Sequence, residues 1–345
     1  MRKPRFFHWS VSSLGSFAAW SLFGAALFYL AIRKVNPTEI VQSIASARLV
    51  YVILGMLSVG LNVLIKATRW RILIGRAGKG LSFSQILFAL VLGQILNWFA
   101  PGRLGDLSRI YLIGKAGPGK AHAFATVALE KIIDLVSYSG LFILTALYLF
   151  PLPNWINRPG IPLAGIMLGI AAGLSLLSLR NDRWRQAIQR FLIIAPGSLK
   201  EFVRGGLHRL FESFHQMRRE NNWAMVIFLT IVAWATAGLT NHLAGLALNL
   251  DLPAAGSLVL LVALYAGISL PGVPGKIGVF QYICILVLGL FSLDQQTGLS
   301  YGILLQALVM LPVTLAGLGY VIWRGASLAT IEQFKGFLAT KENLG

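Results

Sequence analysis

Charged side chains at helical spacing, inside apolar stretches, are the residues of this chain best placed to do chemistry. Arg103, Asp106 and Arg109 follow one another at intervals of three, and Glu130 and Asp134 are four apart. Residues three or four apart share one face of a helix. Because an ionised group at the centre of a bilayer costs about 2.5–3.5 kcal/mol, these groups are expected to pair with one another or with a charged ligand.

Two interpretations of this set can coexist. In the first, the carboxylates and arginines form ion pairs that hold one helical segment against the next. In the second, they form a cationic substrate site whose charge balance shifts during transport. Asp106, Glu130 and Asp134 are then the charge-coupling candidates, which orient the cations, compete for them or carry a coupling proton.

A short proline- and glycine-containing motif occurs once in each half of the chain. Pro101-Gly102-Arg103-Leu104-Gly105 and Pro274-Gly275-Lys276-Ile277-Gly278 begin 173 positions apart in a chain of 345 residues. Proline and glycine break a helix, and broken backbone at membrane depth survives only inside protein or along a cavity. Matched breaks in two halves point to the substrate site of a transporter, and Arg103 and Lys276 beside new helix starts suit an anion. The residues expected to break the backbone are Pro101, Gly102, Gly105, Pro271, Pro274, Gly275 and Gly278.

Three further positions are candidates for headgroup binding. Asn97, just before the first break, is expected to cap freed backbone groups. Arg69-Trp70-Arg71 closes an apolar segment, and is either an interfacial anchor with tryptophan at headgroup depth or a phosphate contact. Gln281 follows the second break and is placed to hydrogen-bond either a headgroup or a neighbouring helix. The substrate-binding candidates are therefore Arg103, Arg109, Lys276, Asn97, Arg69 and Gln281.

The composition is that of a membrane protein. The chain is 56% hydrophobic and 12% charged, its mean hydropathy is +0.72, and its net charge is +18. In a membrane protein this excess indicates cytoplasmic loops and anionic lipid headgroups, and no basic stretch has the aromatic pattern of a nucleic-acid site. One cysteine and five scattered histidines predict no disulfide and no metal site. Motifs for nucleotide binding or hydrolysis are also missing, so no cofactor is expected.

The apolar segments predict an all-α polytopic protein with one membrane domain over 1–345. Two regions, 83–113 and 255–291, are expected to form helical hairpins that dip into the bilayer and return, or else two tightly packed full spans each. The basic loops place both termini in the cytoplasm, so the repeats 49–150 and 223–323 have opposite orientation. Residues 180–222 are predicted to form an amphipathic cytoplasmic linker. The clear spans are 11–32, 49–68, 123–150, 161–179, 223–249 and 300–323.

The ordered motifs resemble those of the flippase-like membrane family. They are Arg69-Trp70-Arg71, Asn97, Pro101-Gly102-Arg103-Leu104-Gly105-Asp106, Arg109, Glu130, Asp134, Pro271, Pro274-Gly275 and Gly278-Val279-Phe280. That family includes the transmembrane flippase region of lysylphosphatidylglycerol synthases and the membrane part of an archaeal glycosylation enzyme. The resemblance covers roughly residues 10–325 and implies lipid translocation. The chain departs from the family at Gln281, where an acidic residue is common, and at Lys131, where arginine often stands.

We therefore expect a flippase of the bacterial or archaeal inner membrane, without an enzymatic domain. Its substrate would be a lipid with an anionic, phosphate-bearing headgroup: a modified phospholipid, or a polyprenyl-phosphate-linked or hopanoid-type lipid. The alternatives are an intramembrane lipid-modifying transferase and a non-transporting assembly factor of an envelope-lipid pathway. Expected partners are the lipid substrate and anionic membrane lipids, with a second copy or a separate lipid-synthesising enzyme left open.

Overall fold

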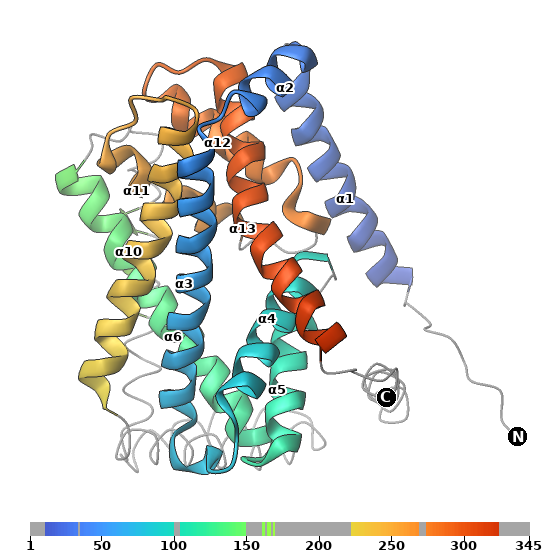
Figure 1. Ribbon diagram of the computed structural model, residues 1–345, viewed down its shortest axis with the longest axis vertical. Coiled ribbons are helices and arrows are strands. Elements are labelled where there is room, and N and C mark those ends of the chain that lie inside the picture. The colour runs from blue at the N-terminus through green and yellow to red at the C-terminus, as the bar shows by residue number, and fades with distance from the viewer. Residues whose placement is uncertain are drawn as a thin grey trace, which may run out of the picture.

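The computed structural model describes residues 11–33, 35–99, 104–149, 222–268 and 274–323, and short pieces at 161–162, 164–166 and 168–169. In these residues all regular structure is helical, as the sequence predicts (Figure 1). The protein is an all-α polytopic membrane protein. Three of the described helices are long and apolar enough to cross a membrane: Leu49–Gly78, Trp223–Ala247 and Gln295–Ile322. Pro101, Gly102, Arg103, Pro271 and the predicted linker up to residue 221 lie outside the described residues.

The helices follow the predicted order closely. Their bounds are α1 (Val11–Ile32), α2 (Pro37–Ala45), α3 (Leu49–Ile74), η1 (Gly75–Gly78), α4 (Phe83–Phe99), α5 (Leu104–Ala116), α6 (Lys120–Leu144), the π-helical turn η3 (Thr145–Leu149), α10 (Trp223–Ala247), α11 (Ala254–Ile268), η4 (Pro274–Lys276), α12 (Val279–Gly289) and α13 (Gln295–Trp323). The helix α2 was not predicted. Its signal was present in the sequence, because Asn36 caps the helix and Pro37 occupies its first turn.

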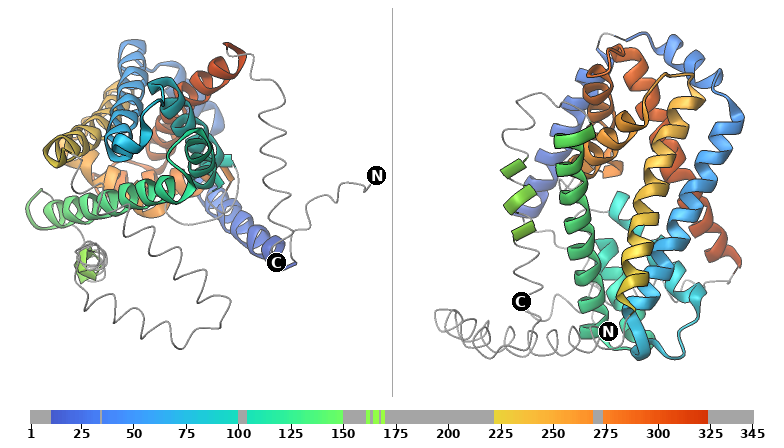
Figure 2. Two further views of the ribbon diagram at one scale, coloured as in Figure 1. Left: turned by 90° about the horizontal axis from the view of Figure 1, so that it is seen from below. Right: turned by 90° about the vertical axis from the view of Figure 1, so that its left-hand side faces the viewer.

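Helices α3 and α10 run antiparallel and lie side by side at one edge of the molecule (Figures 1 and 2). Their contact is polar: the Ser58 hydroxyl donates to the carbonyl of Thr236 over 2.9 Å, and the Asn62 amide donates to the carbonyl of Ala233 over 2.6 Å. Polar side chains that join two helices are favourable in a bilayer, where unpaired polar groups find no water. The buried polar groups of α3 therefore fix which side of it faces α10.

The opposite side of α3 is apolar and exposed. Leu54, Leu57, Leu61 and Leu64 are each between 43% and 63% exposed, and they follow the spacing of one helix face. Their neighbours Ser58 and Asn62 are buried. A helix with polar groups inside and leucines outside suits hydrocarbon as its solvent, which agrees with a span in contact with lipid.

Two helical pairs occupy opposite halves of the molecule. Helices α4 and α5 lie in the lower half of Figure 1 and pack against each other, whereas α11 and α12 lie in the upper half and pack likewise. The four helices have 17, 13, 15 and 11 residues, shorter than the roughly 20 that a bilayer crossing needs. The short segment η4, between α11 and α12, lies beside α4, so the second break contacts the first hairpin.

The remaining helices enclose these pairs. Helix α6 packs against α3, α5 and α11, and α13 packs against α3, α4 and α12, while α1 covers α12. Close approach at the first hairpin depends on glycine, because a Cβ at Gly105 would overlap the carbonyl oxygen of Gly93. The packing therefore brings parts of α3, α5, α6, α10 and α11 to one place, where the charged residues gather.

Candidate functional site

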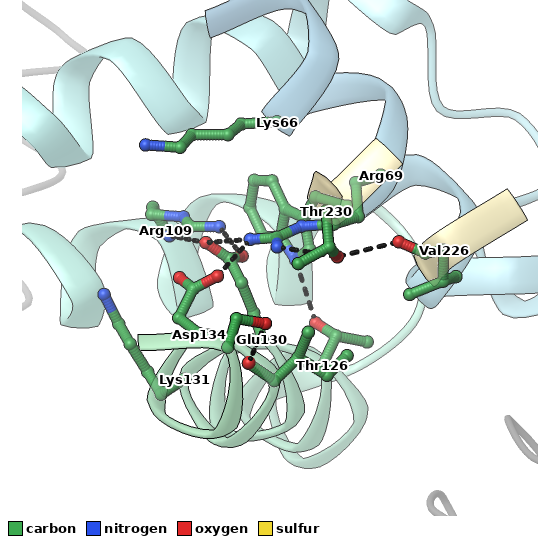
Figure 3. A network of polar contacts seen from close by, with 12 residues as sticks. Lys66, Arg69, Arg109, Thr126, Glu130, Lys131, Asp134, Val226 and Thr230 are labelled. Carbon is green, nitrogen blue, oxygen red and sulfur yellow. Dashed lines mark hydrogen bonds and ion pairs between the residues drawn. The ribbon is translucent and has the colours of Figure 1, made fainter. Parts of the chain in front are cut away.

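The innermost part of the charged cluster is an ion pair between α5 and α6. Arg109 donates through Nη1 and Nη2 to the two carboxylate oxygens of Glu130, over 3.3 and 2.5 Å (Figure 3). Arg109 is 4% exposed and Glu130 is 5% exposed. A two-point contact of this kind fixes both side chains in direction as well as in distance. It attaches the second arm of the first hairpin to the helix that follows.

A second arginine reaches the same helix from α3. Arg69 Nη2 lies 2.8 Å from Asp134 Oδ1 and 3.9 Å from Glu130 Oε1. Its Nη1 donates to the Thr230 hydroxyl of α10 over 3.1 Å, and that hydroxyl donates onward to the carbonyl of Val226 (Figure 3). Arg69 thus ties α3 to both α6 and α10, and Glu130 lies within ion-pair distance of both arginines.

Trp70 forms the apolar floor of this cluster. The Arg109 guanidinium lies over the Trp70 ring with 4.1 Å from its central carbon to the ring centroid, a cation–π contact. The indole Nε1 donates to the Thr126 hydroxyl over 3.1 Å. Arg69 is 1% exposed and Trp70 is fully buried. The interfacial-anchor interpretation is therefore wrong for these two residues, because helices on all sides enclose them.

The first hairpin adds a more open layer of polar contacts. Asp106 Oδ1 accepts from the Asn97 amide over 3.3 Å and lies 3.4 Å from Lys131 Nζ. Asn97 Oδ1 accepts from the backbone N–H of Gly105 over 3.0 Å, which confirms that Asn97 caps backbone freed at the break. The side chains of Lys131 and Asp106 are 45% and 16% exposed, so this layer faces outward from the buried arginines.

The second hairpin reaches the cluster through Tyr265, near the end of α11. Lys66 Nζ donates to the Tyr265 hydroxyl over 3.3 Å, and the Tyr265 ring packs against Trp234 with 4.7 Å between the ring centroids. Lys66 stands three residues before Arg69 on α3, and its ammonium lies above the arginine–carboxylate group in Figure 3. Residues of both hairpins therefore meet at one set of charges.

The second break is held by glutamines. Gln281 Oε1 accepts from the backbone N–H of Gly278 over 2.8 Å, and its amide nitrogen donates to Gln306 of α13. Gln306 in turn donates to the carbonyl of Gly275 over 2.6 Å. Gly275 and Gly278 have φ of +64° and +88°, so the backbone does leave the helical conformation there. Both polar atoms of Gln281 thus serve the backbone and a neighbouring helix.

The predicted residues accordingly fall into three groups. Arg69, Arg109, Asp106, Glu130 and Asp134 come together in one cluster, with Asn97 at its edge. Gln281, Gly275 and Gly278 belong to the second break, where Lys276 is half-buried with φ of +58°. Arg103, Pro101, Gly102 and Pro271 lie outside the described residues.

Some contributors were not predicted. Lys66, Thr230, Tyr265 and Gln306 are single polar residues in apolar helices. Only Lys66 had a signal in the sequence, its three-residue spacing from Arg69. Among the described residues, no group of histidine, cysteine, aspartate and glutamate side chains has the arrangement of a metal site.

The comparison with known proteins agrees with this architecture. The chain matches the family described as the lysylphosphatidylglycerol synthase TM region over residues 15–317. The chain belongs to this family. All residues of the charged cluster lie within the matched range. A similar protein is the UPF0104 membrane protein MJ1078 of Methanocaldococcus jannaschii, 26% identical over 229 residues, which are 65% of this chain and 92% of that protein.

Proposed function

We propose that this protein is a flippase, which moves a lipid with an anionic, phosphate-bearing headgroup across the inner membrane. The headgroup passes through the charged cluster while the acyl or prenyl tail stays in the bilayer. Membership of the lysylphosphatidylglycerol synthase TM region family supports a lipid-related role in the membrane. The proposal adds to that role a means of recognition, in which buried arginines bind the negative phosphate oxygens of the headgroup.

The observation that carries the proposal is the charge of the cluster. Among the described residues, four cations (Lys66, Arg69, Arg109 and Lys131) meet three carboxylates (Asp106, Glu130 and Asp134). A purely structural network would gain from equal numbers, because every uncompensated charge inside a bilayer is unfavourable. The fourth cation, Lys131, is 45% exposed at the edge of the cluster, so the excess positive charge lies at its open side, where it favours an arriving anion.

The hairpins suggest how a headgroup would pass. With the cytoplasmic orientation expected from the basic loops, the more exposed Lys131 and Asp106 face the cytoplasmic entrance, and Arg103 and Arg109 attract the headgroup there. Lys276 would receive it from the outer side. The antiparallel α3 and α10, each followed by a short helical pair, support an inverted repeat with re-entrant hairpins, which is an architecture of alternating access.

A scrambling assay in proteoliposomes tests the proposal. Purified protein is reconstituted with a trace of fluorescent phosphatidylglycerol or fluorescent phosphatidylcholine, and dithionite bleaches the label in the outer leaflet. We expect phosphatidylglycerol to become accessible faster than in protein-free vesicles, and faster than phosphatidylcholine. The double variant Arg69→Gln/Asp134→Asn, which removes an ion pair without leaving a lone charge, should lose this activity.

The matched control is Gly60→Ala, since nothing lies within 4 Å of the position where its Cβ would stand. This variant should transport like the wild type. Equal rates for the two lipids, or an undiminished rate in the double variant, would contradict recognition of the headgroup by the cluster.

A further inference from the structure

The two buried arginines hold their carboxylates very differently. Glu130 contacts Arg109 through both oxygens, and its side chain is 6% exposed. Asp134 contacts Arg69 through Oδ1 alone, and its side chain is 29% exposed. Within the described residues, Asp134 Oδ2 accepts no hydrogen bond. The Arg109–Glu130 pair is therefore a fixed part of the fold, whereas the Arg69–Asp134 pair is the more easily exchanged.

Arg69 is also less than fully satisfied by its present partners. Its Nη1 donates to Thr230, and its Nη2 lies 2.8 Å from Asp134 Oδ1 as an ion pair. Among the described residues, neither Nη2 nor Nε of Arg69 has a hydrogen-bond partner, although Arg69 is 1% exposed; in Arg109 only Nε lacks one. The Nε and Nη2 atoms form one edge of the guanidinium, the edge that accepts two oxygens of a carboxylate or phosphate side by side. A single carboxylate oxygen leaves half of that edge unused.

Lys66 adds a second positive charge beside the Asp134 carboxylate and the Arg69 guanidinium. Its ammonium interacts electrostatically with both Asp134 and Arg69, and it is held in place by the Tyr265 hydroxyl. An anion that takes the position of the Asp134 carboxylate would meet the open edge of Arg69 and the charge of Lys66 together. A phosphodiester carries the same single negative charge as a carboxylate and presents two acceptor oxygens.

We propose that Asp134 is the resident counter-ion of a phosphate subsite on Arg69 and Lys66, and that an arriving anionic phosphate displaces its carboxylate. This rests on the proposed function insofar as the phosphate belongs to a lipid. In the empty site, Asp134 spares Arg69 from being a buried, unpaired charge. During transport it competes with the phosphate, so binding stays weak enough for release on the other side.

The test is a binding measurement on the full chain in nanodiscs, with fluorescent phosphatidylglycerol and inorganic phosphate as separate probes. Asp134→Asn removes the competing charge but keeps the shape, and it should bind at least one probe about tenfold more tightly. The probe that gains identifies the source of the phosphate. Asp134→Glu, which retains the carboxylate, should show no such gain, and Gly60→Ala, where nothing lies within 4 Å of the added Cβ, should bind both probes like the wild type. Unchanged or weaker binding of both probes by Asp134→Asn would overturn the proposal.

The double variant Arg69→Gln/Asp134→Asn keeps the test decisive if the single variant fails to fold. It lacks both the competing carboxylate and the guanidinium edge, so the loss of Arg69 should cancel the gain from the loss of Asp134, and it should bind neither probe more tightly than the wild type. Tighter binding by the double variant than by the wild type would overturn the subsite, because the gain would then not depend on Arg69. Binding and transport are separate readouts. Tighter binding by Asp134→Asn without any scrambling by the wild type would support the subsite and refute the flippase. Scrambling by the wild type without tighter binding by Asp134→Asn would support the flippase and refute the subsite.

Discussion

Replacing Glu130 with glutamine tests whether the arginine–carboxylate pair is as deeply buried as the structure places it. Glu130→Gln preserves the shape of the side chain but leaves the Arg109 guanidinium without its two-point partner. The nearest remaining carboxylate oxygen is Asp106 Oδ1, at 3.9 Å. Arg69 also loses a carboxylate oxygen at 3.9 Å. Breaking a buried pair in this way costs about 3–5 kcal/mol, because an uncompensated charge stays inside.

The assay is unfolding of the purified protein in mixed micelles, followed by tryptophan fluorescence. We expect the free energy of unfolding to fall by about 4 kcal/mol in Glu130→Gln. Lys131→Gln, one residue further along α6, is the matched control. Its ammonium lies 3.4 Å from Asp106 but its side chain is 45% exposed, so the loss should be under about 1 kcal/mol.

Removing both partners separates charge burial from packing. Arg109→Gln/Glu130→Gln leaves no lone charge, so we expect it to be more stable than Glu130→Gln alone. The reasoning is refuted if Glu130→Gln costs no more than Lys131→Gln, or if the double variant is the least stable of the three. Either result would mean that water reaches the pair in the folded protein.

Two further variants probe the backbone breaks. Gly105→Ala should lose about 3 kcal/mol or more of stability, because its Cβ would overlap a backbone carbonyl of α4. Gly60→Ala, with open space around it, should melt at the wild-type temperature or slightly above. Equal melting temperatures for the two variants would show that α4 and α5 do not pack this closely. Gln306→Ala should cost about 1–3 kcal/mol, since it removes the acceptor of the Gln281 amide and the donor to the Gly275 carbonyl. Unfolding in the same mixed micelles measures the loss, and an unchanged stability would contradict the link between α13 and the second break.

The helices were largely predictable, because the lengths of the apolar segments and the positions of helix-breaking residues indicate where helices begin and end. The span 11–32 coincides with α1, and the predicted hairpins 83–113 and 255–291 each contain two short helices. Proline and glycine mark the breaks between them by local backbone chemistry, which needs no knowledge of distant residues. The same local reasoning identified Asn97 as a cap.

The contacts between helices that are distant in the sequence were harder to predict from the sequence. Arg69 and Trp70 sit near the end of an apolar run, and sequence position alone cannot distinguish a side chain at the lipid headgroups from one enclosed by other helices. Tyr265 and Thr230 are isolated polar residues whose role depends on α3 lying next to them. Such partners emerge only when the packing of antiparallel α3 and α10 is known.

The most direct test of the central claim is a cryo-electron microscopy structure of the protein in nanodiscs rich in phosphatidylglycerol. The account predicts density for a lipid headgroup whose phosphate lies within hydrogen-bond distance of Arg69 and near Lys66, with Asp134 turned away from the guanidinium. Headgroups found only at the outer surface of the helices, with Arg69 still paired to Asp134 at every lipid concentration, would contradict it.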